Sequence, residues 1–137
     1  LVDLDIIQQK EQLKFIQKNS LHIKKIVSYH NYNEPPTREK LKQLVNNMIK
    51  YNPEIIKVAT KCNSRQDALR LLDLLLDLKS KNLRFIVSGM GKFGRITRVA
   101  GAIWGNAIVY APLTLAESSA EGQFTRSQFQ TILGYFK

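Results

Sequence analysis

Short apolar segments with strand-like composition alternate with longer amphipathic segments along all 137 residues. Strands that alternate with helices form parallel βαβ units, because neighbouring parallel strands need a crossover connection. The pattern therefore predicts an α/β fold in which helices cover a parallel sheet. The expected strands are 1–7, 21–30, 54–60, 84–91 and 106–113, and the expected helices are 8–20, 36–51, 64–82, 95–105 and 125–136.

The helix expected over 64–82 has the clearest start signal in the chain. Ser64 is a good N-cap residue, and Asp67 places an acid in the first turn, where the helix dipole favours it. The helix over 36–51 opens with Pro36 and Thr37 and repeats apolar residues at helical spacing. Both helices should bury one apolar face.

Two architectures fit this order of elements. One is an open doubly wound sheet, and the other is part of a (β/α)8 barrel, which in complete form has eight strands and about 250 residues. Spacing and composition leave the two open. No Gly-x-Gly-x-x-Gly pattern follows the first strand, which weakens a dinucleotide-binding interpretation.

The chain is basic, with 21 Lys and Arg against 11 Asp and Glu and a net charge of +10. These cations are spread through helical segments and form no dense cluster, so a solvated basic surface is favoured and no nucleic-acid partner is expected. Binding of another polyanion, or attraction of a small anionic substrate, stays open.

The chain contains one cysteine, Cys62, which excludes an intramolecular disulfide. No cluster of Cys and His provides ligands for a structural zinc, and a reducing cytoplasm is the expected location. No apolar run approaches the roughly 20 residues needed to span a bilayer, so no membrane partner is expected. The chain does not begin with Met, and we expect it to be a piece of something longer.

Lys57 lies in the middle of the strand "EIIKVAT" (54–60), where a charged side chain is costly to bury. Side chains alternate along a strand, so Ile56 and Val58 share one face and Lys57 the other. If helices pack on the Ile56 face, Lys57 points into a barrel interior or a sheet crevice. Desolvation favours a neutral amine, which is a nucleophile toward carbonyls. The alternative is a strand-end lysine that reaches solvent.

His30 ends the strand that precedes Lys57 in the sequence. In α/β proteins the carboxyl ends of the strands are where ligands meet side chains, and a histidine there can act as a general acid or base. The alternative is a hydrogen-bonded histidine with a structural role.

Two later segments carry further candidates. In "SGMGKFGRITRVAG" (88–101), Arg98 follows a glycine-rich turn and could pair bidentately with a carboxylate. The polar loop "ESSAEGQF" (117–124) contains Ser119 and Gln123 and could act as a lid. The ordinary alternatives are a simple turn and a connecting loop.

Four motifs in this order resemble the type I 3-dehydroquinate dehydratases of the shikimate pathway. The motifs are "VSYHNYNEPP", "EIIKVAT", "SGMGKFGRITRVAGAIWGNAIVY" and "SSAEGQF", and the resemblance covers nearly the whole chain. It implies a (β/α)8 TIM barrel, of which this chain holds about strands four to eight as one partial domain, residues 1–137.

The resemblance also implies a role for each candidate residue. Lys57 would form an imine with 3-dehydroquinate, and His30 would be the general acid and base that removes water to give 3-dehydroshikimate. Arg98 would bind the substrate carboxylate, with Ser119 and Gln123 in the lid. The resemblance implies no metal and no organic cofactor, and it is compatible with a homodimer.

Strands one to three of the barrel would lie upstream of this chain. With them we expect substrate-contacting glutamate and arginine residues, and a glutamate that orients the histidine, to be absent. Asp5 stands where the family often has Glu, and Glu121 replaces a frequent proline. Another lysine-imine barrel such as a class I aldolase, an inactive fragment and a basic binding module are the alternatives.

Overall fold

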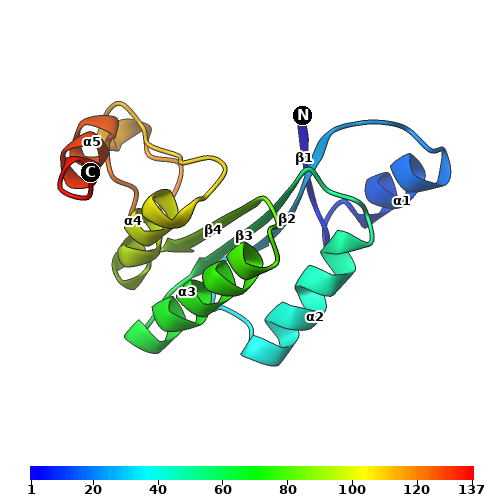
Figure 1. The fold of residues 1–137 in the computed structure, drawn as a ribbon, viewed down its shortest axis with the longest axis horizontal. Coiled ribbons are helices and arrows are strands. Elements are labelled where there is room, and N and C mark those ends of the chain that lie inside the picture. Colours follow the sequence, from blue (N-terminus) through cyan, green and yellow to red (C-terminus); the bar gives the residue numbers. More distant parts are fainter.

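A computed structural model describes residues 1–137 and contains one four-stranded parallel sheet with the strand order β1-β2-β3-β4 (Figure 1). A helix follows each strand, as the sequence predicts. The strands are β1 (Val2–Asp5), β2 (Lys25–Asn31), β3 (Ile55–Lys61) and β4 (Phe85–Met90). The helices are α1 (Lys10–Lys18), α2 (Arg38–Ile49), α3 (Arg65–Ser80), α4 (Arg95–Trp104) and α5 (Arg126–Gly134), with short 3-10 helices η1 (Lys92–Gly94) and η2 (Leu115–Glu117).

The expected caps of the two long helices are present. The Thr37 side chain accepts a hydrogen bond from the Lys40 N–H at the start of α2, and the Ser64 side chain accepts one from the Asp67 N–H at the start of α3. Both helices then pack their apolar faces on the sheet (Figure 1). No helix is both long and apolar enough to cross a membrane.

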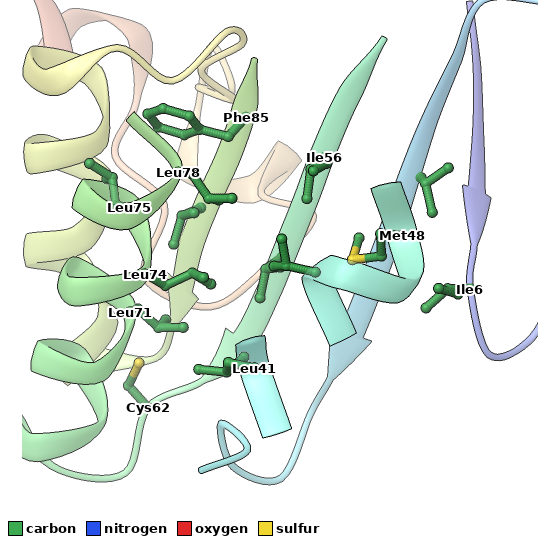
Figure 2. Close-up of a cluster of buried hydrophobic side chains, with 14 of the residues drawn as sticks. Ile6, Leu41, Met48, Ile56, Cys62, Leu71, Leu74, Leu75, Leu78 and Phe85 are labelled. Carbon is green, nitrogen blue, oxygen red and sulfur yellow. The ribbon is translucent and has the colours of Figure 1, made fainter. Parts of the chain in front are cut away.

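The main core lies between the sheet and its helices, as Figure 2 shows. The β3 side chains Ile56 and Val58 point into it and are almost completely buried. The residues of this core are Ile6, Leu13, Val27, Leu41, Val45, Met48, Ile56, Val58, Cys62, Leu71, Leu74, Leu75, Leu78, Phe85 and Val87.

The opposite face of the sheet carries a much smaller apolar cluster. Ile26, Ile55 and Ile86 come from three neighbouring strands, and the partly buried side chains of Ala107 and Ile108 pack against them. No helix packs there, whereas a doubly wound sheet has helices on both faces. Helices on one face alone are the arrangement of a (β/α)8 barrel, in which the other face lines the interior. The structure therefore decides between the two architectures that the sequence left open.

The strand predicted over 106–113 does not form. The Asn106 side chain donates to the Val87 carbonyl and accepts from the Val87 N–H, so it takes two bonds that a neighbouring strand would use. Ala107 N–H then donates to the Phe85 carbonyl, and the chain turns across the inner face. A strand here would have β4 on one side and no strand of this chain on the other, which leaves little to hold a ladder.

A buried leucine and an exposed leucine in α3 test which face of the helix packs in the core. Leu75 is completely buried and Leu76 is 48% exposed, although the two residues are adjacent. We expect Leu75→Ala to lower the free energy of unfolding by about 2 to 5 kcal/mol, because it leaves a cavity. Leu76→Ala should change it by about 0.5 kcal/mol or less. Urea unfolding measures both, and equal costs would contradict the one-sided core.

Candidate active site

The carboxyl ends of the parallel strands gather all five predicted site residues around one pocket of about 220 Å³. Lys57 and His30 come from β3 and β2, Arg98 from α4, and Ser119 and Gln123 from the loop before α5. The complete lining is His30, Tyr32, Lys57, Ala59, Ile86, Ser88, Met90, Arg98, Tyr110, Ser119, Ala120 and Gln123. Another pocket, of about 270 Å³ between α2 and α3, contains charged side chains but none of these residues.

Lys57 points away from the helices, because its neighbours Ile56 and Val58 occupy the opposite face of β3. Its side chain is only 15% exposed, and its Nζ donates to Asp3 Oδ2 at 2.7 Å. The Tyr110 ring lies 5.3 Å from the same Nζ. Sequence reasoning placed Lys57 on this face of β3 but missed its two contacts, Asp3 and Tyr110.

His30 is held by Asp5 of β1, a contact that sequence reasoning did not predict. Its Nδ1 lies 2.9 Å from Asp5 Oδ2, and the other Asp5 oxygen accepts from the Ile7 and Gln8 N–H groups at 2.8 and 3.0 Å. A histidine that donates Nδ1–H to a carboxylate presents Nε2 as an acceptor. Asp5 therefore fixes the orientation of the His30 ring from within this chain.

Two opposing effects determine the pKa of the Asp5 carboxyl. Burial raises its pKa, but the hydrogen bonds from His30 and from the Gln8 and Ile7 N–H groups outweigh burial. The net pKa lies below the ordinary value of an aspartate. Asp5 therefore stays ionised beside His30 at neutral pH.

Arg98 reaches the pocket because two glycines bring the end of β4 against the start of α4. A Cβ on Gly94 would lie 2.3 Å from the Gly89 carbonyl carbon, so no side chain fits there. Arg98 Nε donates to the Gly89 carbonyl at 3.0 Å. Burial lowers the pKa of the guanidinium, but an arginine keeps its charge at neutral pH.

Arg98 has no anionic partner within the chain. It is only 7% exposed, yet none of the eight ion pairs includes it. Only its Nε forms a hydrogen bond inside the protein. A buried cation without a counter-charge, facing a pocket, is suited to bind an anion.

The segment 118–123 lies against the turn that follows β4. Gly91 N–H donates to the Glu121 carbonyl at 3.0 Å, and the Glu121 side chain pairs with Lys61 at the end of β3. Gly122 has a φ of 86°, and a Cβ there would lie 2.7 Å from the Gly91 oxygen. The glycine thus permits both the backbone conformation and the close approach.

Ser119 and Gln123 hold each other in this segment. Gln123 Oε1 accepts from the Ser119 N–H at 2.9 Å, and Gln123 Nε2 donates to Ser119 Oγ at 3.2 Å. Gln123 is 7% exposed and both residues line the pocket. The loop therefore offers a hydroxyl and an amide from one preformed unit.

The helices pack on one face of the parallel sheet, and a lysine, a histidine and an arginine gather at the strand ends of the other face. This arrangement is that of a segment of a (β/α)8 barrel with a site at its carboxyl end. Comparison with known proteins identifies the family. The model of the type I 3-dehydroquinase family matches residues 1–137, and the chain belongs to that family.

Relatives support this assignment over nearly the whole chain. The 3-dehydroquinate dehydratase of Hydrogenobaculum sp. is 38% identical over 113 residues, which are 82% of this chain and 49% of that protein. The 3-dehydroquinate dehydratase of Methanocaldococcus jannaschii is 33% identical over 124 residues, or 89% of this chain and 54% of that protein. The crystal structure of the 3-dehydroquinate dehydratase from Geobacillus kaustophilus superposes with a TM-score of 0.84 at 26% identity, covering 98% of this chain and 53% of that one. The chain thus spans about half the length of these relatives, and the (β/α)8 assignment is confirmed.

The Asp5 interactions predict a pH-dependent stability. A carboxyl whose pKa is lower in the folded state stabilises the protein above its unfolded pKa of about 3.9, and this stabilisation is lost as the pH falls through the folded pKa. We expect Asp5→Asn to cost about 1 to 2 kcal/mol at pH 7. Urea unfolding should show that the difference from wild type shrinks progressively below about pH 4.

The control for this experiment is Glu11→Gln, which removes a carboxylate whose side chain is 80% exposed in α1. Glu11→Gln should change the free energy of unfolding little at pH 7 and at pH 3. A cost for Asp5→Asn that is the same at pH 7 and pH 3 would show that the charge of Asp5 contributes nothing to stability.

Proposed function

We propose that this chain carries the catalytic half of a type I 3-dehydroquinate dehydratase, which removes water from 3-dehydroquinate to give 3-dehydroshikimate in the shikimate pathway. The observation that carries the proposal is the meeting of Lys57, His30 and Arg98 around one pocket from three separate elements. Family membership supports the choice of substrate, and the geometry supports a role for each residue.

The ammonium of Lys57 first releases a proton, and the free amine attacks the substrate carbonyl. Its nitrogen forms a bond to the carbonyl carbon, the carbonyl oxygen leaves as water with the two protons that the nitrogen has lost, and a protonated imine remains on Nζ. The iminium withdraws electrons from the neighbouring C–H bond, so that a base of ordinary strength can remove the proton. The position of Lys57 on the inner face of β3, with 15% of its side chain exposed, supports this role.

His30 takes that proton through Nε2 and returns it to the hydroxyl that leaves as the product water. The contact between its Nδ1 and Asp5 at 2.9 Å supports the assignment, because it fixes the ring and keeps Nε2 toward the pocket. One residue then provides both proton transfers of the elimination.

Arg98 binds the carboxylate of the substrate, and Ser119 and Gln123 bind its hydroxyl groups from the lid. The absence of an anionic partner for the Arg98 guanidinium supports the first assignment. The position of Ser119 and Gln123 in the pocket lining supports the second. A bidentate guanidinium also orients a planar carboxylate, which an ammonium cannot do.

The remaining strands of the barrel would pack beside β1. An apolar groove of about 570 Å³ runs along this edge, and six of its eight lining residues are hydrophobic. Val2, Phe15 and Leu21 are among its exposed apolar side chains. A surface of this kind is typical of an interface, and strands one to three of the barrel are its proposed occupant.

A homodimer is a second proposed assembly. Ile96, Ile103 and Trp104 lie on α4 at positions i, i+7 and i+8, share one stripe, and are each more than a third exposed. We also infer that the protein acts in the cytoplasm, where the buried thiol of Cys62 would stay reduced.

Reductive trapping tests the imine. The protein produced from its whole reading frame should gain the mass of the reduced substrate adduct on the Lys57 peptide when treated with 3-dehydroquinate and borohydride. Lys57→Ala should give no adduct and no turnover, because no other residue supplies the nucleophile. Lys61→Ala, at the end of the same strand, is the matched control and should still be trapped on Lys57. A label on another lysine in an active preparation would disprove the assignment, and cleavage of a carbon–carbon bond instead of loss of water would favour an aldolase.

Steady-state kinetics test the substrate contacts. We expect Arg98→Lys to raise KM about tenfold to a hundredfold and Gln123→Ala about threefold to tenfold, because charged and neutral hydrogen bonds are lost respectively. Both variants should still form an imine with a small carbonyl compound. Arg126→Lys and Gln130→Ala, exposed on α5, are the matched controls and should leave KM unchanged. Unchanged KM in both site variants would reject the carboxylate clamp and the lid together.

A further inference from the structure

Two carboxylates of the edge strand β1 contact residues of the site, and each contacts a different one. Asp3 and Asp5 are two residues apart, so both lie on the inner face, while Leu4 between them packs against the main core. Asp5 contacts His30, and Asp3 reaches past β2 to Lys57 on β3. The proposed function uses only the first of these contacts.

The second contact is close and charged. Asp3 Oδ2 lies 2.7 Å from Lys57 Nζ, and the two side chains are 35% and 15% exposed. A largely buried ammonium is costly unless it is paired, and Asp3 provides the pair. This explains how a lysine is accommodated between the buried side chains of β3.

No other carboxylate contacts the Lys57 nitrogen. The ionisable groups that face it are Asp3 from β1, His30 from β2, Arg98 from α4 and Tyr110 from the segment after α4. Arg98 is a cation, His30 is bound to Asp5, and Tyr110 presents its ring. Asp3 is therefore the carboxylate that pairs with the Lys57 nitrogen.

The nitrogen carries one positive charge on both sides of imine formation. An ammonium and a carbonyl give a protonated imine and water, so that the positive charge before the reaction equals the charge after it. A carboxylate that stabilises the ammonium is therefore in place to stabilise the iminium. Only a protonated imine is a strong electron sink for the removal of the neighbouring proton, after which the nitrogen becomes the neutral nitrogen of an enamine.

We propose that Asp3 is the counter-ion of the Lys57 nitrogen, holding the resting ammonium in the site and keeping the imine protonated until His30 has removed the proton. Asp3 is in this sense a positioning residue, since it acts through Lys57. The proposal rests on the imine chemistry proposed above, and its test separates the two.

The first measurement is the pH dependence of turnover of 3-dehydroquinate in wild type, Asp3→Asn, Asp3→Glu and Asp73→Asn, each produced from the whole reading frame. Asparagine keeps the shape and an oxygen acceptor but removes the charge. We expect kcat of Asp3→Asn to fall at least tenfold at pH 8, and the alkaline limb of its profile to move to lower pH by about one unit or more, because the uncompensated imine loses its proton more easily. Asp3→Glu should restore the position of the limb. Asp73→Asn removes a surface carboxylate paired with Arg38 and should match wild type.

The second measurement needs no substrate. At pH 7.5, a small aldehyde with cyanoborohydride should modify Lys57 about threefold to tenfold faster in Asp3→Asn than in wild type, because an amine without its counter-ion is more often neutral. Peptide mass mapping reports the rate, and the circular dichroism spectrum shows that each variant is folded. If Asp3→Asn does not fold, Asp3→Ser replaces it in the same assay, and Asp3→Glu is the control that keeps the charge.

The outcomes are distinct. If kcat of Asp3→Asn is lower at every pH but the alkaline limb of the profile does not move, Asp3 has only a structural role and the proposal is overturned. Aldehyde modification that is equal or slower in Asp3→Asn would overturn it as well. Loss of the imine with 3-dehydroquinate in wild type, together with faster aldehyde modification in Asp3→Asn, would reject the proposed function and leave the counter-ion in place for the ammonium alone.

Discussion

The structure depends on the strict alternation of side chains along β3. Ile56 and Val58 supply the face that packs on the helices, and this leaves Lys57 on the other face, where no helix covers it. The same rule places His30 on the inner face of β2, since Val27 lies in the main core three residues before it. Hydrophobic burial on one side of the sheet thus determines where the polar groups of the site must lie, because a slip by one residue would exchange the two faces.

The basic side chains on the inner face of the sheet differ in whether a carboxylate of the protein pairs with them. The inner face holds a lysine, a histidine and an arginine, and the first two each contact one carboxylate of β1. Arg98 differs, because it is as buried as Asp5 yet has no such partner. Two of the three basic groups are therefore neutralised by the protein, and the third is left for an anion from outside. This asymmetry fits a substrate with a single carboxylate better than it fits a polyanion such as a nucleic acid.

Much of the fold follows from local rules that the sequence states directly. The order of elements was predictable because several local signals indicate the same structure. These signals are the Ser64 and Thr37 caps, the apolar face of α3 and the β-branched residues of the strands. The segment 106–113 was mispredicted because its composition is that of a strand, whereas a strand also needs a partner; the Asn106 amide occupies the bonds at Val87 instead. Residues close in space but distant in sequence were also missed. Nothing local to "VDLD" reveals that Asp3 meets Lys57, 54 positions away, although the spacing of Asp3 and Asp5 shows that they share a face.

The place of these two carboxylates on an edge strand has a dynamic consequence. β1 is four residues long and pairs with β2 alone, and elements of that kind open more readily than the centre of a sheet. If β1 frays, Lys57 and His30 lose their partners in the same event, although the rest of the sheet stays folded. The proposed nucleophile and the proposed base are thus coupled through the local opening of one strand. A neighbouring strand on the free side of β1 would then act on the chemistry without touching either residue, by shifting the population in which both ion pairs exist.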